Sequence, residues 1–257
     1  MEIKKTSKTK EKIKKFIKDY PEVKFTLFLF SVWAPSIVLV TLFLGRKYRD
    51  SFLDNILAGG HGLAFDIFVF GVLIVIYNRL LEKKRDINRW KEEIDDYRYW
   101  KEPEATYRIV GSIRRLNKFN VHEFSLHSCY LKKACLRSAD LHGNTILSFA
   151  FLEGADLIDA DLRGVDLRAA EMGGAILEIA NLQNANLAGA TLKKAHFSEA
   201  ILKEANLCRA DLTGAIGLKI SQLCEVKTLY GALLDSEIAA QVKEHCPQLL
   251  KDPGGGI

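Results

Sequence analysis

The sequence lacks the short motifs on which many enzymes depend. It has no Cys-x-x-Cys pair, no glycine-rich phosphate-binding loop and no Cys/His grouping with zinc-ligand spacing. No serine or cysteine partner is suggested by the spacing of four histidines near the middle of the chain, His122, His127, His142 and His196. We therefore predict no catalytic residue, no cofactor and no metal site, and we expect a protein that is not an enzyme.

Paired cysteines are lacking as well. The five cysteines are odd in number and widely spaced, at Cys129, Cys135, Cys208, Cys224 and Cys246. This pattern predicts structural thiols in a reducing compartment rather than a disulfide framework.

Basic charge is concentrated in the first part of the chain. Residues 1–101 carry 20 Lys or Arg against 13 Asp or Glu, whereas residues 102–257 carry 17 against 19. The basic segment also contains the most apolar stretches. This placement favours contact with a membrane surface over contact with nucleic acid.

Two apolar segments near the N-terminus predict a transmembrane hairpin. Residues 25–44 contain no charge, and residues 56–77 are about as long, so each could cross a bilayer as a helix. A buried soluble hairpin is the alternative. Residues 1–24 and 78–101 are richer in Lys and Arg than the loop 45–62, which places both termini in the cytoplasm. We expect a multi-pass integral membrane protein with its larger, C-terminal part also in the cytoplasm.

Asp66 is an ionisable residue inside the second predicted span. Such a residue is a candidate functional site, for oligomer packing or for an ion path. The simpler interpretation is that Asp66 lies in the outer part of the span, near His61, where it reaches water or hydrogen-bonds a neighbouring helix.

A helical connector is expected to follow the hairpin over residues 79–118. Apolar residues at heptad spacing form one seam, which consists of Leu80, Ile87, Trp90, Ile94 and Tyr97. The seam pairs either with a second copy of the chain or with the downstream domain of the same chain. A second short helix is expected over 103–118, with apolar residues at Tyr107, Val110, Ile113 and Leu116.

From residue 119 to residue 216 the sequence repeats every five residues. A large apolar residue recurs at 19 positions, 15 of them leucine, and alanine stands two residues before it in 14 cases. We align this residue at Val121, Leu126 and so on to Leu141 and Ile146, place one extra residue between Leu141 and Leu152, and continue to Leu212.

Neither a helix nor a flat strand accommodates this period. Five residues advance 140° beyond a full helical turn, and an odd step in a strand alternates faces. A chain that turns a corner every five residues would direct every leucine to one axis. Four corners close a square coil of about 20 residues, and successive coils stack at about 4.8 Å.

The repeated units at 155–159, 160–164, 180–184, 185–189, 205–209 and 210–214 read A(D/N)Lxx and resemble the pentapeptide repeat proteins. The resemblance implies a right-handed, four-sided β-helix. The segments around residues 106–121 and 228–250 also resemble bacterial membrane pentapeptide proteins with two N-terminal spans, which implies an inner-membrane location.

Several details follow from a 20-residue coil. Gly154, Gly174 and Gly214 should share one corner and adopt positive φ, with Lys194 interrupting the row. The extra residue should form a bulge. The 103–118 helix should cover the front of the stack. Residues 221–250 should form a helical cover at its back, with Asp235 as the N-cap of a helix over 236–246.

The fold class is therefore an α-helical membrane anchor joined to an all-β solenoid. It is expected to begin with a basic N-terminus (residues 1–24), a transmembrane hairpin (25–78) and a helical connector with the front cap (79–118). The β-helix (119–216) and a C-terminal helical cap with a tail (217–257) follow.

The interior of leucine and alanine leaves no polar cavity, so the leading interpretation is a non-enzymatic scaffold. It would hold an unknown cytoplasmic protein at the lipid bilayer. One alternative is an oligomeric, channel-like effector that uses Asp66 and the seam. The other is a DNA mimic that binds topoisomerase, as some pentapeptide proteins do. The DNA mimic would need an acidic surface patch, for which the candidates are Glu153, Asp156, Asp159, Asp161, Asp166 and Glu171. Nucleic acid itself is not an expected partner.

Overall fold

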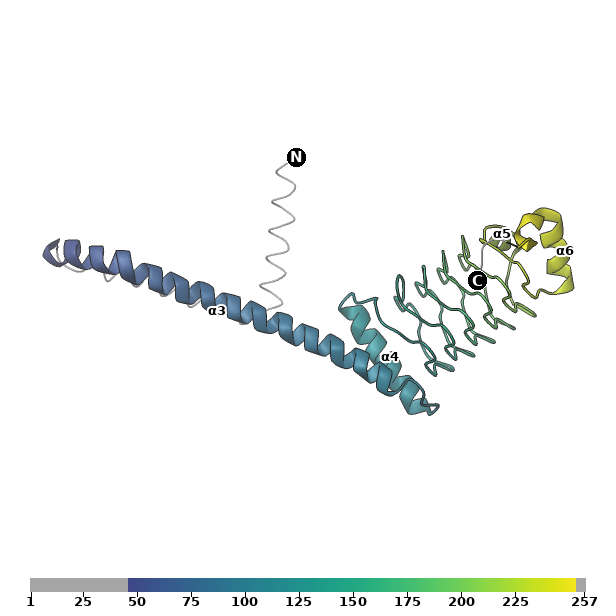
Figure 1. The fold of residues 1–257 in the computed structure, drawn as a ribbon, viewed down its shortest axis with the longest axis horizontal. Coiled ribbons are helices and arrows are strands. Elements are labelled where there is room, and N and C mark those ends of the chain that lie inside the picture. Colours follow the sequence, from purple (N-terminus) through teal and green to yellow (C-terminus); the bar gives the residue numbers. More distant parts are fainter. Residues whose placement is uncertain (1–45, 253–257) are drawn as a thin grey trace. The chain divides into compact units, whose positions relative to one another are not determined.

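The structure is a computed structural model, and it describes residues 46–252, with side chains from Phe70 onward. The chain divides into two compact units, residues 1–85 and residues 86–257. The second unit contains the repeats, with helix α4 (Pro103–Lys118) at one end and helices α5 (Ile220–Cys224) and α6 (Ser236–His245) at the other, as Figure 1 shows.

Helix α3 (Arg46–Asp96) contains the second segment that we predicted to span a membrane. Side chains in most of that segment, and the whole of the first predicted span at 25–44, lie outside the described residues. Among the helices within the described part of the chain, none is both long enough and apolar enough to cross a membrane.

In repeats with Asp or Asn before the leucine, every backbone N–H group has an acceptor, as in repeat 155–159. Two N–H groups donate to the following coil, one to the preceding coil, one closes a turn, and one donates to the Asp or Asn side chain. In repeat 155–159, the N–H groups of Leu157 and Asp159 donate to the following coil, and that of Asp156 donates to the preceding coil. The Ala155 N–H closes the turn by donating to the Leu152 carbonyl, and the Ile158 N–H donates to Asp156 Oδ1 at 3.1 Å. Since buried backbone donors need partners, this arrangement explains why Asp or Asn so often precedes the leucine.

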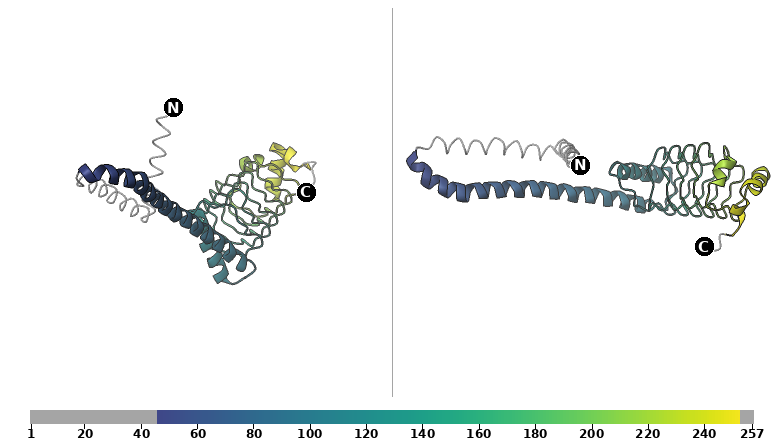
Figure 2. Two further views of the ribbon diagram at one scale, coloured as in Figure 1. Left: turned by 60° about the vertical axis from the view of Figure 1, so that its left-hand side comes forward. Right: turned by 90° about the horizontal axis from the view of Figure 1, so that it is seen from above.

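The coils stack through parallel single-residue bridges about 20 residues apart, such as Asp161–Asn181 and Asn181–Ile201. Figure 2 shows the coils lying one upon another along a single axis. The leucine of each repeat and the alanine two residues before it point inward and are almost fully buried, as at Leu182 and Ala180. Burying each leucine stabilises the fold by about 1.5–3 kcal/mol, so the column of leucines is the core of the domain.

The corners of the coil require a left-handed backbone. Gly154, Gly174 and Gly214 have φ of 64°, 64° and 69°, which confirms the predicted corner, and Lys194 interrupts the row with φ 55°. The same conformation recurs at the other corners, often without glycine, as at Ile179 with φ 60°. Across most corners an alanine N–H donates to the carbonyl three residues earlier, the arrangement of a type II turn, whose third residue needs positive φ.

The extra residue lies earlier than our alignment placed it. Leu147 is fully buried, whereas Ile146 is 39% exposed and forms bridges to both neighbouring coils. The predicted alignment was therefore wrong at Ile146, and the extra residue belongs to the corner between Leu141 and Thr145. Thr145 replaces the usual alanine, and its hydroxyl donates to the His122 carbonyl at 2.6 Å.

The front of the stack is covered by α4, as predicted. Its buried side chains are Ala105, Thr106, Ile109, Val110, Ser112, Ile113 and Leu116. Tyr107, which recurs at the same spacing, is 77% exposed.

Side chains of α4 and the preceding turn also replace the missing coil. Within the stack, the carbonyl before each leucine accepts an N–H from the preceding coil, which the first coil does not have. On its four faces the substitutes are Arg98 Nη2 to Ser125 O (3.4 Å), Thr106 Oγ1 to Tyr130 O (3.0 Å), Arg114 Nη2 to Cys135 O (3.3 Å) and Asn117 Nδ2 to Asp140 O (2.5 Å). Each face is thus closed by one side chain.

The back of the stack differs from the predicted helical cover. After α5 the coil resumes. Three observations show this: Leu229 is fully buried, Gly231 has φ 68°, and Asp211 bridges Leu233. Helix α6 and the 3₁₀ helix η1 (Pro247–Leu250) follow. The Asp235 side chain does not cap α6; its carboxylate accepts the Gly214 N–H at 3.0 Å, so it closes the β-helix instead.

The cysteines also differ from the prediction. Cys224, at the end of α5, forms a disulfide with Cys246, directly after α6, across a Cα–Cα distance of 5.6 Å. The two cysteines are far apart in the sequence, and the sequence did not predict the resumed coil between the two helices that brings them together. Cys129, Cys135 and Cys208 are free, and burial raises the pKa of the Cys129 thiol to about 12, which makes it unreactive.

Candidate functional site

The six acidic residues that we grouped as a patch lie on different faces of the coil. Residues five apart in the repeat are a quarter of a coil apart, so Asp156, Asp161, Asp166 and Glu171 occupy four different columns of bridges. The prediction of one acidic surface was therefore wrong.

Most of these acidic groups also have partners. Asp156 pairs with Arg137 at 3.1 Å, Asp159 accepts the Ser138 hydroxyl at 2.9 Å, and Glu153 lies 4.0 Å from Lys132. Hydrogen bonds from Arg163 and Arg168 hold the pKa values of Asp161 and Asp166 below their usual range. The carboxylates thus serve the corners and the neighbouring basic side chains, and they do not form a concentrated negative field.

Four of the five seam residues are engaged within the chain's own domain. Ile94 is buried, Ile87 and Tyr97 pack against the same core, and the Trp90 ring lies 5.2 Å from the Phe119 ring. This is the second of the two arrangements that the heptad spacing allowed. Leu80 is exposed. The candidate intramembrane residues Asp66 and His61 lie in α3, where the structure does not describe side chains.

Glu93 of α3 fastens the connector to α4. Its carboxylate accepts the Ser112 hydroxyl at 2.6 Å and an Arg115 N–H at 3.3 Å, and Arg108 lies 3.9 Å away. The connector is therefore part of the front cap of the repeat domain, held by a polar cluster beside the apolar seam.

An apolar surface that the sequence reasoning missed lies at one corner of the first two coils. We call it the aromatic edge, and it consists of Tyr130, Ile146, Phe149 and Phe151. Ile146 and Phe149 are 39% and 55% exposed. The Tyr130 and Phe151 rings lie 5.9 Å apart, and the His127 ring meets Phe149 edge-on at 5.5 Å.

The repeat itself does not require apolar residues at this surface. In the next three coils the columns above Ile146 and Phe151 are polar, with Asp166, Asn186 and Asn206 in one and Glu171, Thr191 and Asp211 in the other, before Leu233 in the resumed coil. Phe149 also has φ 58°, a conformation that disfavours a bulky residue. The same conformation recurs at other corners, as at Ile179, so what distinguishes Phe149 is its place beside Ile146 and the two aromatic rings.

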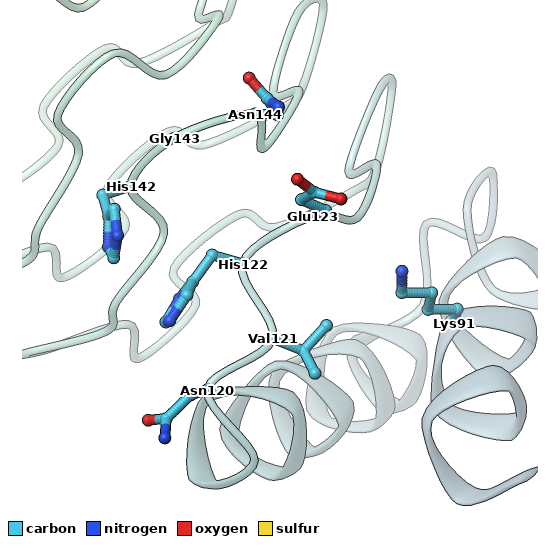
Figure 3. Close-up of a pocket in the computed structure, with 8 residues that line it drawn as sticks. All are labelled: Lys91, Asn120, Val121, His122, Glu123, His142, Gly143 and Asn144. Carbon is cyan, nitrogen blue, oxygen red and sulfur yellow. The ribbon is translucent and has the colours of Figure 1, made fainter. Parts of the chain in front are cut away.

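A small pocket of about 440 Å³ opens beside the first corner of the coil, where Figure 3 shows His122 and His142 with their rings side by side. Together with Asp140 they form, among the described residues, a group whose ligand atoms lie within 4.8 Å of one another. Sequence reasoning missed this group. The signal was the spacing of the two histidines, because residues 20 apart share a corner of a 20-residue coil.

The comparisons with known proteins agree with the repeat. Residues 144–178 and 180–216 match the family model of pentapeptide repeats, in 8 copies. Pentapeptide repeat proteins are generally not enzymes, in agreement with the prediction from sequence. No curated protein sequence matches the chain.

Three solved structures illustrate the likeness. HetL, a pentapeptide repeat protein involved in heterocyst differentiation regulation from the cyanobacterium Nostoc sp. strain PCC 7120, is 33% identical, over 44% of this chain and 54% of HetL, with a TM-score of 0.32. The present chain thus spans about half the length of HetL. The pentapeptide repeat protein alr5209 from Nostoc PCC 7120 is 25% identical, over 49% of this chain and 95% of alr5209, with a TM-score of 0.29. QnrB1, a plasmid-mediated fluoroquinolone resistance protein, is 24% identical, over 47% of this chain and 66% of QnrB1, with a TM-score of 0.21. The five-residue period, the four-sided coil and the match to the family model are those of pentapeptide repeats, and the matched segments lie in the repeat domain of this chain.

Proposed function

We propose that this protein is a non-catalytic scaffold that is anchored in a membrane and holds a protein partner on the aromatic edge. The proposal joins two parts of the chain. The repeat domain supplies a stiff surface, and the N-terminal segments supply the anchor.

The single observation that supports partner binding most strongly is the exposure of Ile146 and Phe149 beside the Tyr130 and Phe151 rings. Exposed apolar groups that cluster at one place on an otherwise polar surface are typical of protein interaction sites. Aromatic side chains contribute strongly at the centres of such interfaces because they bury a large area with few rotatable bonds.

The stiffness of the coil favours this use. Most backbone N–H groups of the repeats are paired, and the leucine column is almost fully buried. A partner that docks on such a surface does not have to order it first, so little of the interaction free energy is lost to conformational entropy.

The anchor is proposed from the sequence. Residues 25–44 are free of charge, and Lys and Arg are concentrated on either side of the two apolar segments. We place the repeat domain in the cytoplasm, at the inner membrane of a bacterium. The Cys224–Cys246 disulfide is more typical of an oxidising compartment. The solvent-accessible free thiols of Cys135 and Cys208 are more typical of a reducing one, and together with the charge pattern they lead us to keep the cytoplasmic side.

The two other functions that the sequence suggested find less support in the described residues. A topoisomerase-binding DNA mimic needs a continuous acidic surface, and the carboxylates here are divided among four faces and largely paired. An oligomer built on the seam would compete with the packing of Ile94 inside its own domain.

Two matched substitutions test the aromatic edge. Phe149 and Ile179 are both more than half exposed, and both have φ near 60° at a corner of the coil, but they lie at different corners. Phe149→Asn and Ile179→Asn therefore relieve the same backbone strain and remove similar exposed surface. The full-length chain and both variants would be purified from the native host in mild detergent, and the bound proteins quantified by mass spectrometry. We expect Phe149→Asn to lose a partner that the wild type and Ile179→Asn retain. Equal retention by both variants would refute docking at the aromatic edge.

The anchor has a separate test. Membranes that contain the full-length chain would be washed at alkaline pH, which releases peripheral proteins but not proteins that span the bilayer. We expect the chain to stay with the membranes after the wash. Release into the supernatant would contradict the anchor without affecting the docking surface.

A further inference from the structure

His122, Asp140 and His142 converge at the corner where the first coil meets the second. His122 Nδ1 lies 3.5 Å from Asp140 Oδ1. His142 Nδ1 contacts the same oxygen, and the centroids of the two imidazole rings lie 4.4 Å apart. Two ring nitrogens from neighbouring coils are thus directed at one carboxylate oxygen.

The repeat places these residues and holds them in position. Each histidine directly follows the central residue of its repeat, Val121 or Leu141, so the two occupy the same corner position one coil apart. Asp140 stands in the repeat position that bonds the corner backbone. Asn117 of α4 fixes its main chain from below, because its side-chain amide bonds both Asp140 O (2.5 Å) and Asp140 N (3.1 Å).

One ring nitrogen in this group has no hydrogen-bond partner. His122 Nδ1 is buried from solvent and forms no hydrogen bond, whereas His142 Nδ1 shares a hydrogen bond with Asp140. A buried polar atom without a partner is unfavourable by about 1–3 kcal/mol, and such an atom calls for a specific explanation.

We propose that His122 Nδ1, His142 Nδ1 and Asp140 Oδ1 bind a divalent transition-metal ion of the zinc class. Imidazole nitrogens select zinc, cobalt or nickel over magnesium and calcium, which prefer oxygen ligands. Zinc binds His nitrogen and carboxylate oxygen at about 2.0–2.2 Å in a tetrahedral arrangement. That arrangement places ligand atoms about 3.5 Å from one another, which is the separation between His122 Nδ1 and Asp140 Oδ1. His142 Nδ1 is hydrogen-bonded to the same oxygen, so metal binding would replace that hydrogen bond and move the two atoms apart.

The surroundings leave one position for water. The pocket beside the two histidines is open to solvent, so a fourth ligand can enter from there. Asp161 Oδ2 lies 3.8 Å from His142 Nδ1, but Arg163 already binds both oxygens of that carboxylate. The site would thus have three protein ligands and a fourth position that water can reach.

A metal ion here would join two coils where the backbone does so weakly. Among the described residues, the parallel bridges between the first and second coils begin at Ser125, after the corner that contains His122. The same corner of the second coil, His142 to Asn144, contains the extra residue. The ion would therefore act as a clamp on the least regular part of the coil, and we expect it to raise the thermal stability of the repeat domain.

The test uses the full-length chain in detergent after removal of metal with a chelator. Co²⁺ binding would be followed by visible absorption, and Zn²⁺ affinity by competition with a chromophoric chelator. Three variants address the ligands, namely His122→Gln, His142→Gln and Asp140→Asn, and the last keeps a side-chain oxygen for the corner backbone. His196→Gln is the matched control, because His196 lies 3.7 Å from one carboxylate, that of Glu178, on another face.

We expect the wild type and His196→Gln to bind one ion per chain, and the three ligand variants to bind it more than about 10-fold more weakly. Zinc should raise the melting temperature only of the first two proteins. Equal affinity in the wild type, His122→Gln and Asp140→Asn would overturn the proposal, since binding would then occur elsewhere, for instance at the exposed Cys135 thiol.

A second measurement needs no substitution. Diethyl pyrocarbonate modifies accessible imidazoles, and the modified residues can be mapped by mass spectrometry. Stoichiometric Zn²⁺ should protect His122 and His142 of the wild-type chain but not His196, and Mg²⁺ should protect none of them. Unchanged modification of His122 and His142 in the presence of Zn²⁺ would also overturn the proposal, even if the ligand variants failed to fold.

Discussion

Asn117 and Asp140 exchange two hydrogen bonds, from the Asn117 side-chain amide to the Asp140 carbonyl and from the Asp140 N–H to the Asn117 side-chain oxygen. Within the stack, the main chain of a neighbouring coil makes bonds of this kind. The amide of Asn117 has the same donor and acceptor as a peptide group, so it substitutes for a coil that does not exist. A helix can therefore end a β-helix without leaving its edge unpaired.

Replacement of Asn117 by leucine should weaken this end of the domain. Asn117→Leu leaves the Asp140 N–H and carbonyl without these partners, and we expect the free energy of unfolding to fall by about 1–3 kcal/mol. Lys118→Leu, the next and exposed position of α4, should change it by no more than about 0.5 kcal/mol. Denaturant titration of the full-length chain, followed by circular dichroism, measures both. Equal effects would show that the amide does not act as a cap.

Removal of the β-branched side chain at Ile179 should stabilise the protein. Ile179 is more than half exposed and has φ 60°, where an L-residue is strained by about 1–2 kcal/mol. Glycine removes that strain but adds entropy to the unfolded chain, so Ile179→Gly should gain about 0.5–1 kcal/mol.

The reverse substitution at Gly174 is the control. Gly174 has φ 64°, and a Cβ added there would meet no atom within 4 Å. Gly174→Ala thus introduces backbone strain without a steric clash, and it should lower the melting temperature where Ile179→Gly raises it. If both substitutions shift the melting temperature in the same direction, backbone strain at positive φ does not control the stability of these corners.

The sequence predicted the coil well in the part of the chain where only one backbone arrangement is compatible with the spacing of the leucines. Leucines five apart exclude a helix and a flat strand, so the inward column from Leu152 to Leu212 follows directly from the period. The alignment was wrong at Ile146 because Ile146 and Leu147 are both apolar and Thr145 replaces the usual alanine. The resumed coil at Leu229 was missed because α5 interrupts the period and too few repeats follow it.

The site was harder to predict because neighbours in sequence are not neighbours on this fold. Asp156, Asp161 and Asp166 look like one patch in the sequence, yet each five-residue step moves to another face. His122 and His142 look unrelated, yet the coil length brings them together. Heptad spacing alone could not decide whether Ile94 faces a second chain or its own domain, since both surfaces are apolar.

Asp166 should contribute to stability only above acidic pH. The hydrogen bond from Arg168 holds the pKa of its carboxyl below the ordinary value of about 3.9. The folded state therefore gains stability from the ionised form above that value and loses it as the pH falls through the lower, folded-state pKa. Arg168 is largely exposed, so at neutral pH we expect a contribution of no more than about 1 kcal/mol.

Asp166→Asn isolates this contribution, because Asn186 and Asn206 in the same column bond the corner backbone equally well. The difference in unfolding free energy between the wild type and Asp166→Asn should be present at pH 7 and shrink as the pH falls below about 3.9. Arg168→Met should abolish the same pH dependence while Asp166 remains. A difference that persists unchanged into acid would show that the pair with Arg168 is not its source.

The Cys224–Cys246 disulfide should hold the back cover in place. It joins residues 22 apart in sequence, and closing a loop of that length stabilises a fold by about 3 kcal/mol, chiefly by restricting the unfolded chain. Thermal melts of the full-length chain should show a loss of this order in Cys224→Ser and Cys246→Ser, and the same loss when the wild type is reduced. Cys208→Ser removes a thiol without removing the bond, so it should leave the melting temperature unchanged. Reduction that shifts the melts of the wild type and Cys224→Ser equally would mean that the pair does not form in solution. The compartment argument would then rest on the charge pattern alone, because no bond typical of an oxidising environment would stand against a cytoplasmic repeat domain.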